Sequence, residues 1–162
     1  MSGLADQVRS LIDYNEWANA KIFDAADGLT DEQLDSRSSA SFETIRGSLT
    51  HILWAQRIWH ARWTRTTADS PDSSTLESIR RGFEESHNDL REFASGLNDQ
   101  GAVGSFDYSD SKGIPYRRGL GSLMIHMVNH GTYHRGEVAL MLTAMDRSPG
   151  DLDYVYFLPS GV

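Results

Sequence analysis

Four long stretches of this chain place apolar side chains at the 3.6-residue spacing of an amphipathic α-helix. The stretches cover residues 4–26, about 42–63, about 76–97 and about 120–145. A helix with one apolar stripe is stable in water mainly when that stripe packs against another element. Four stripes of similar length therefore predict an all-α fold, a four-helix bundle.

Capping residues mark where these helices begin. Thr30 and Gln33 form a capping-box pattern, which predicts a short helical turn after the first helix. Ser41 is a candidate N-cap of the second helix. Ser74 and Glu77 form another capping-box pattern, and it predicts the start of the third helix.

The first helix carries one polar residue in its apolar stripe. Gly28 predicts the end of this helix, and Asn15 falls in the middle of the stripe. Asn15 would then face the interior and need a hydrogen-bond partner there. In the alternative, the helix is rotated slightly so that Tyr14 or Trp17 packs in its place.

The connection before the last helix is long and has a different composition. Residues 101–119 lose the helical period and are rich in Gly, Ser, Asp and Pro, which predicts a short hairpin or an irregular crossover. The apolar segment 151–158 is expected to lie across the bundle. From the chain length we expect one domain over residues 1–162.

Composition excludes several classes of partner. Lys and Arg total 15 against 23 Asp and Glu, and the net charge of -8 repels nucleic acid and anionic membrane surfaces. No apolar run approaches the roughly 18 residues of a membrane span, and the N-terminus does not resemble a signal peptide, so a cytoplasmic protein is expected. Because the chain has no cysteine, any metal must be bound through nitrogen or oxygen.

The strongest chemical signal lies in the last helix. His126, His130 and His134 follow one another at i, i+4 and i+8. For six histidines placed at random in 162 positions, the expected number of such runs of three is on the order of 0.01. Residues four apart share one helix face, roughly 6 Å apart along the axis, which suits chelation of one cation. On a helical wheel His130 and His134 point into the apolar arc, whereas His126 and Glu137 lie at its edge.

A third ligand is expected from a neighbouring helix, because two imidazoles rarely hold a metal tightly by themselves. The remaining histidines are His51, His60 and His87. His51 shares the core-facing side of the second helix, whereas His60 projects toward the exposed side and His87 lies among polar residues of the third. We therefore predict a metal site formed by His51, His130 and His134.

Three neutral imidazoles suit zinc, nickel, copper or iron(II), and they leave a coordination position for water or substrate. An open position is typical of catalytic sites, since structural zinc sites usually have four protein ligands. The alternative is a site that only joins the helices. A fourth protein ligand, such as Glu137 or a residue of 101–118, stays open at this point.

Four segments resemble the DinB-like family of metalloenzymes, which includes the YfiT-like hydrolases and bacillithiol transferases. NHGTYHRGE at 129–137 looks like the signature of that family. YNEWANAKIFDAADGLTDEQL at 14–34 is similar to its first helix, SFETIRGSLTHILWAQRIWHARW at 41–63 to its second, and PGDLDYVYFL at 149–158 to its tail. The resemblance thus spans nearly the whole chain.

The resemblance implies a four-helix bundle in which His51, His130 and His134 hold a divalent metal. Zinc and nickel are both associated with the family, and iron and manganese are further candidates. It also implies a small-molecule substrate, with either hydrolysis or transfer of a low-molecular-weight thiol such as bacillithiol, mycothiol or glutathione. Relatives often form homodimers, so a homodimer is expected.

Residues around the histidines are candidates for supporting roles. Those that alternate with the ligands are Asn129, Tyr133, Arg135 and Glu137. One or two of them are candidates to orient imidazole N–H groups. In the alternative, Tyr133 is core, Arg135 is on the surface and Glu137 belongs to an ion pair. The candidates for a catalytic role are His126, as a proton shuttle or substrate contact at the rim, and Glu137; an edge histidine without a role is the alternative for His126.

Two other functions stay open from the sequence. One is a non-catalytic metal-binding module of a stress response or a sensor, which would change its assembly without consuming a substrate. The other is a purely structural bundle, which would unfold when the metal is removed.

Overall fold

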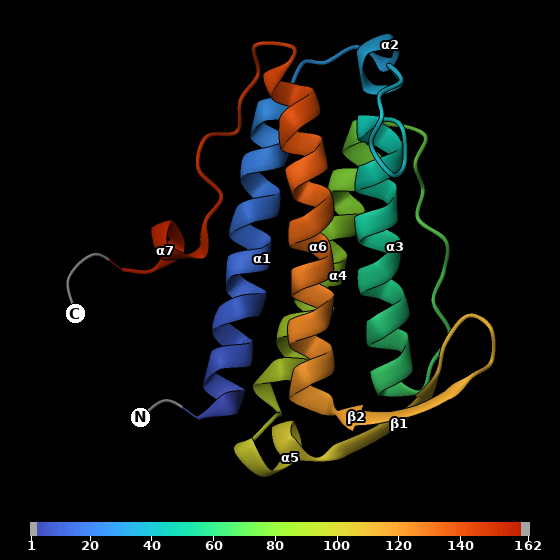
Figure 1. Cartoon of the computed structure of the whole chain (residues 1–162), viewed down its shortest axis with the longest axis vertical. Coiled ribbons are helices and arrows are strands. Elements are labelled where there is room, and N and C mark those ends of the chain that lie inside the picture. The colour runs from blue at the N-terminus through green and yellow to red at the C-terminus, as the bar shows by residue number, and fades with distance from the viewer. Residues whose placement is uncertain (1–2, 160–162) are drawn as a thin grey trace.

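The four long helices stand side by side, and the shorter elements lie at the ends and on one flank of the bundle (Figure 1). The computed structural model describes residues 3–159. Within that range its seven helices and two strands are α1 Leu4–Ala26, α2 Asp31–Leu34, α3 Ile45–Thr64, α4 Leu76–Ser95, α5 Asp99–Val103, β1 Ser105–Ser109, β2 Pro115–Gly119, α6 Leu120–Thr143 and α7 Tyr154–Phe157. The predicted all-α four-helix bundle is confirmed.

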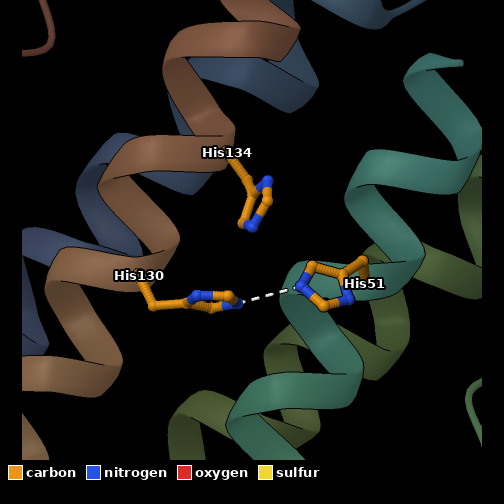
Figure 2. Close-up of side chains that lie close together, drawn as sticks. All are labelled: His51, His130 and His134. Carbon is orange, nitrogen blue, oxygen red and sulfur yellow. Dashed lines mark hydrogen bonds between the residues drawn. The ribbon is translucent and has the colours of Figure 1, made fainter. Parts of the chain in front are cut away.

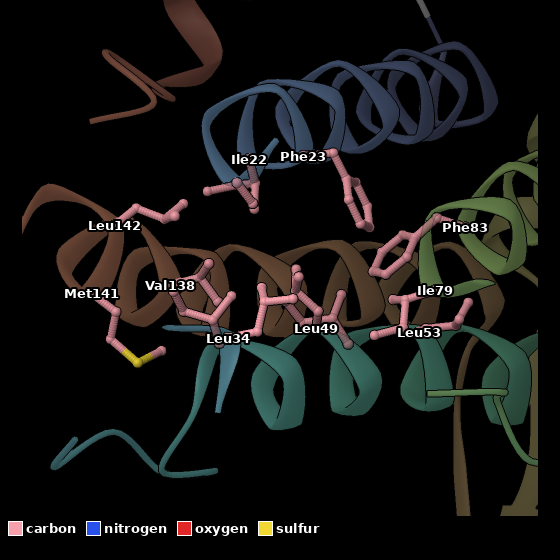
Figure 3. Close-up of a cluster of buried hydrophobic side chains, with 13 residues drawn as sticks. Ile22, Phe23, Leu34, Leu49, Leu53, Ile79, Phe83, Val138, Met141 and Leu142 are labelled. Atoms are coloured by element: carbon pink, nitrogen blue, oxygen red, sulfur yellow. The ribbon is translucent and has the colours of Figure 1, made fainter. Parts of the chain in front are cut away.

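Apolar side chains from the long helices form two clusters, one toward each end of the bundle. The first lies at the α2 end and joins α1, α2, α3, α4 and α6 (Figure 3). Within it the rings of Phe23 and Phe83 meet edge to face, with centroids 5.1 Å apart. The second cluster surrounds Trp59 and Trp63 near the other end. Burial of these stripes is the main stabilisation of the fold.

Buried polar side chains separate the two apolar clusters. Along each long helix they fall between the members of the two clusters, and they comprise Asn19, Gln56, Ser86, His87, His134 and Arg135. Asn15, which is also buried, lies one turn before Asn19 among members of the second cluster. Arg135 donates hydrogen bonds to Asn15 Oδ1 at 2.6 Å and to Asn19 Oδ1 at 3.1 Å. Asn15 thus faces the interior and has a hydrogen-bond partner there, which was the first of the two alternatives for this helix. Tyr14 is buried beside it.

The same network determines the protonation of His87. The carbonyl oxygen of Asn19 is used by Arg135, so its amide nitrogen faces His87 and donates to Nε2 at 3.2 Å. Burial, together with the charges of Arg91 and Arg135, lowers the pKa of His87 to about 4. His87 is therefore a neutral histidine within the core.

The start of α3 differs from the prediction. Thr44 is the N-cap and α3 begins at Ile45, whereas the sequence favoured Ser41 as the cap of a helix from about residue 42. Glu43 has a left-handed φ of 59°, which keeps the chain before Thr44 out of the helix. Ser41 is not a cap because its N–H and hydroxyl both donate to Glu137.

The other caps lie at or next to their predicted positions. Thr30 and Gln33 form the predicted capping box of α2. The capping box of α4 is made by Thr75 and Ser78, so the predicted start at Ser74 was wrong by one residue. Serine and threonine are both preferred at an N-cap, so the sequence did not separate the two neighbouring positions.

Of the two alternatives for this connection, a short hairpin or an irregular crossover, the structure shows a hairpin between α5 and α6. β1 and β2 pair antiparallel, in register from Ser105 opposite Gly119 to Ser109 opposite Pro115. The five-residue helix α5 before it was not predicted. Tyr108 of β1 packs on Trp59, with ring centroids 5.2 Å apart, so the hairpin covers the C-terminal end of α3. No helix within residues 3–159 combines the length and apolarity that a membrane span requires.

Two glycines of α6 differ in the space around them, and this gives a stability prediction. A Cβ at Gly131 would lie 2.9 Å from Arg135 Nη1 and 3.2 Å from Asn15 Oδ1. Because hydrogen bonds hold both groups in place, we expect Gly131→Ala to lower the free energy of unfolding by about 1–3 kcal/mol. Within residues 3–159, a Cβ at Gly136 would meet no atom within 4 Å, so Gly136→Ala is expected to raise the free energy of unfolding by up to about 1 kcal/mol. Urea denaturation checks both, and equal stabilisation by the two variants would contradict the account.

The neutral state of buried His87 predicts a pH dependence of stability. The pKa is about 4 in the folded chain against an ordinary 6.5, so between these values the unfolded chain binds more protons. The contribution of His87 to the free energy of unfolding is therefore complete above pH 6.5 and is lost as the pH falls toward 4. We expect His87→Gln to reduce the change in the free energy of unfolding between pH 6.5 and 4 by up to about 3 kcal/mol. His60→Gln is the matched control and should leave this change as it is in the wild type. Urea denaturation at a series of pH values tests this; parallel profiles for wild type and His87→Gln would disprove it.

Candidate metal centre

Three imidazole rings meet between α3 and α6. His51 comes from α3, and His130 and His134 come from successive turns of α6, with their rings converging on one point (Figure 2). One ring nitrogen from each lies within 4.8 Å of the other two. His51 Nε2 and His130 Nε2 are 2.9 Å apart. The structure thus brings together the three histidines that the sequence singled out, and leaves His60 and His87 elsewhere.

The environment of His51 and His130 favours the neutral form of their rings. Burial, followed by the nearby His134 and His130, lowers the pKa of His51 to about 4. Burial and the neighbouring His134 also lower the pKa of His130. Cations repel one another in so small a space, and desolvation adds to that cost. A neutral imidazole carries the free lone pair that a metal ligand needs.

Glu137 fixes the orientation of His134. Its Oε2 accepts a hydrogen bond from His134 Nδ1 at 2.8 Å. Its Oε1 accepts two from Ser41, at 3.0 Å from the backbone N–H and 2.6 Å from the hydroxyl. Although burial acts in the opposite direction, the hydrogen bonds from Ser41 and His134 keep the pKa of Glu137 below its ordinary value. Because Nδ1 of His134 carries the proton, its Nε2 is left as the ligand nitrogen.

Phe42 forms an apolar wall over the site. Its ring stacks on that of His51, with centroids 3.7 Å apart and an angle of 18° between the planes. It also meets His134 edge to face at 5.3 Å. The left-handed backbone of Glu43 turns the chain from this wall into α3. Neither Ser41 nor Phe42 was predicted to belong to the site, because a serine just before a helix is most simply interpreted as its cap.

Two of the candidate residues around the ligands, Tyr133 and His126, are exposed. Tyr133 is 62% exposed, so it is not a core residue, and its ring packs edge to face on His134 at 4.9 Å. The exposed ring of His126 lies 5.5 Å from Trp59 and 6.2 Å from His130. This position at the edge of the site agrees with the helical wheel.

Arg135 and Asn129 lie away from the imidazoles. Asn129 is exposed. Arg135 is 1% exposed, so the alternative that placed it on the surface was wrong, and it donates to Asn15 and Asn19 of α1. Within residues 3–159, the carboxylate that bonds a ring nitrogen of the site is that of Glu137.

The comparisons with known proteins agree over nearly the whole chain. The model of the DinB family matches residues 1–160. The chain is also 24% identical to Protein DinB of Bacillus subtilis (strain 168) over 169 residues, which covers 96% of this chain and 95% of that protein. With its helical bundle and its group of three histidines, this chain belongs to the DinB family.

Proposed function

We propose that this protein is an enzyme that uses one divalent metal ion, held by His51, His130 and His134, to act on a small molecule. The observation that supports this proposal is the convergence of three imidazole ring nitrogens from two helices within 4.8 Å. Zinc and nickel are our first candidates for this ion because imidazole nitrogens suit them, and iron(II) and manganese are the second candidates.

The donor set fits a divalent metal with an open coordination position. Among the described residues the group contains three ligand atoms, and the carboxylate of Glu137 is occupied by His134 and Ser41. When bound, the ion would supply Lewis-acid chemistry, polarising a substrate atom or lowering the pKa of a thiol or a water molecule. Three protein ligands are typical of catalytic rather than structural zinc sites.

The surrounding residues support catalysis in separate ways. Glu137 orients His134, and Ser41 orients Glu137. Phe42 excludes water from one face of His51. A cavity of about 290 Å³ adjoins Glu137 and is lined in part by Leu140 and Met141, so it offers room for an apolar part of the substrate. His126, exposed at the rim, stays a candidate for proton transfer.

We infer either thiol transfer to an electrophile or hydrolysis as the reaction. A chain without cysteine has no thiolate that competes for the metal, which favours a thiol cosubstrate such as bacillithiol, mycothiol or glutathione. Consumption of such a thiol with 1-chloro-2,4-dinitrobenzene, or hydrolysis of 4-nitrophenyl acetate, by metal-loaded protein would support the enzyme. Metal binding without turnover across thiols, esters and electrophiles would favour the sensor module. The homodimer stays a prediction.

Metal stoichiometry tests the ligand set directly. We expect untagged protein reconstituted with zinc or nickel to bind about one ion per chain, because three imidazoles converge on one point. His51→Ala, His130→Ala and His134→Ala should each lose the ion, measured by elemental analysis after gel filtration. His60→Ala is the control and should retain it. A wild type that stays empty, or a control that loses metal as readily, would refute the site.

The hydrogen bond between Glu137 and His134 predicts a weaker effect. We expect Glu137→Gln to reduce zinc affinity by about 10–100-fold, because the ring loses a charged partner that fixes its tautomer. Ser41→Ala should act in the same direction and less strongly. Glu84→Gln, at an exposed position of α4, is the matched control. Competition with a chromogenic chelator gives the affinities, and unchanged affinity in Glu137→Gln would disprove this role.

A further inference from the structure

Among the residues that the structure describes, buried Arg135 has no negatively charged partner. It is the largest fully buried side chain among residues 3–159, and none of the ion pairs in that range involves it. Its guanidinium is charged at neutral pH, because an arginine side chain does not lose its proton in proteins. A buried charge is costly unless an opposite charge or a full set of hydrogen bonds compensates it.

The hydrogen bonds of Arg135 do not use all of its donors. A guanidinium has five N–H groups. Nη1 donates to the two neutral amides of Asn15 and Asn19, and Nη2 donates once, to Thr132 Oγ1 at 2.8 Å. The buried Nε–H has no acceptor in the described part of the chain. Nε and the second Nη2 hydrogen therefore remain for one further acceptor.

Arg135 forms part of the wall of a cavity of about 430 Å³. The cavity lies between α1, α6 and the segment before α7. Apolar residues make up much of the remaining wall, namely Leu11, Ile125, Val128 and Leu152. Its lining includes none of the three site histidines. It is thus separate from the metal centre, and its volume is that of a small-molecule pocket.

The segment of residues 152–154 closes this cavity on one side. It runs along the flank of α1 (Figure 1). Tyr14 Oη donates to the carbonyl of Leu152 at 2.8 Å, and the hydroxyls of Ser10 and Tyr154 are 2.7 Å apart. Asp153 is the carboxylate in the lining, and it is exposed, so solvent weakens its repulsion of an anion.

We propose that this cavity binds a small organic carboxylate with an apolar body, whose carboxylate pairs with Arg135. The carboxylate would supply the missing counter-charge and accept the unused N–H groups, since Arg and carboxylate pair through two hydrogen bonds. The apolar wall would receive the rest of the ligand. This proposal does not depend on the function proposed for the metal centre.

The probe is 4-phenylbutyrate, compared with its neutral amide, 4-phenylbutyramide, by calorimetric titration of the full chain. We expect the carboxylate to bind at least tenfold more tightly than the amide, and Arg135→Met to remove this preference. Asp153→Asn should tighten carboxylate binding two- to threefold. Equal affinity of wild type for carboxylate and amide, or no binding of the carboxylate, would overturn the proposal.

A second pair of variants tests the location without changing the buried network. Gly136 belongs to the cavity lining, and a Cβ there would meet no atom of the described part of the chain within 4 Å. Gly136→Trp should therefore obstruct the cavity and weaken carboxylate binding at least tenfold, whereas Gly136→Ala should retain it. This comparison decides the matter even if Arg135→Met does not fold.

A carboxylate could instead bind to a metal ion on the three histidines, and a further variant separates the two sites. We expect His130→Ala to bind 4-phenylbutyrate as the wild type does. Binding that is lost in His130→Ala but kept in Gly136→Trp would place the carboxylate at the metal centre and refute the proposal. Failure of the metal stoichiometry test would leave this result unaffected.

Discussion

The guanidinium of Arg135 joins α6 to α1 through two buried asparagines, and the middle of the bundle is arranged around this contact. Residues 134 and 135 are consecutive on one helix, so their side chains point about 100° apart. When Arg135 is held against α1, the direction of His134 toward α3 is fixed as well. Gly131 leaves the space that the guanidinium fills. The orientation of the candidate ligands thus depends on a contact on another face of the same helix.

Apolar and polar contacts contribute differently to this fold. The two apolar clusters favour compaction, but apolar stripes tolerate small rotations and shifts of a helix at low cost. A rotation of α6 would leave the donors of Arg135 and the acceptors of Asn15 and Asn19 buried without partners, which costs more. We infer that the buried polar layer specifies the register of α1 and α6, while the clusters above and below it supply most of the stability.

Much of the fold and the central site could be predicted from residue spacing. The first helix ends at Ala26 as predicted, and Gly28, two residues later, has a positive φ of 74°. The histidines at i and i+4 share a face because helical geometry alone requires it. Asn15 was the signal for a polar interior.

Contacts between residues far apart in the chain were not predictable in this way. Ser41 and Glu137 are 96 positions apart, and nothing local to Ser41 distinguishes a cap from a partner of a distant carboxylate. Arg135 was placed on the surface in one alternative because arginine usually lies there. Its burial depends on the asparagines of α1 and on Gly131, one turn earlier in α6. Nothing in the sequence connects these residues with Arg135.

The segment that carries Phe42 determines how His51 meets solvent. It is held to α6 by the two hydrogen bonds from Ser41 to Glu137 and by a contact of Ser38 with Met141. Breaking these few contacts costs far less than unfolding four packed helices. The rate at which an ion enters or leaves would then follow the local opening of this segment, while the bundle stays folded. A rigid ligand set and rapid exchange are compatible in such an arrangement, because they depend on different parts of the chain.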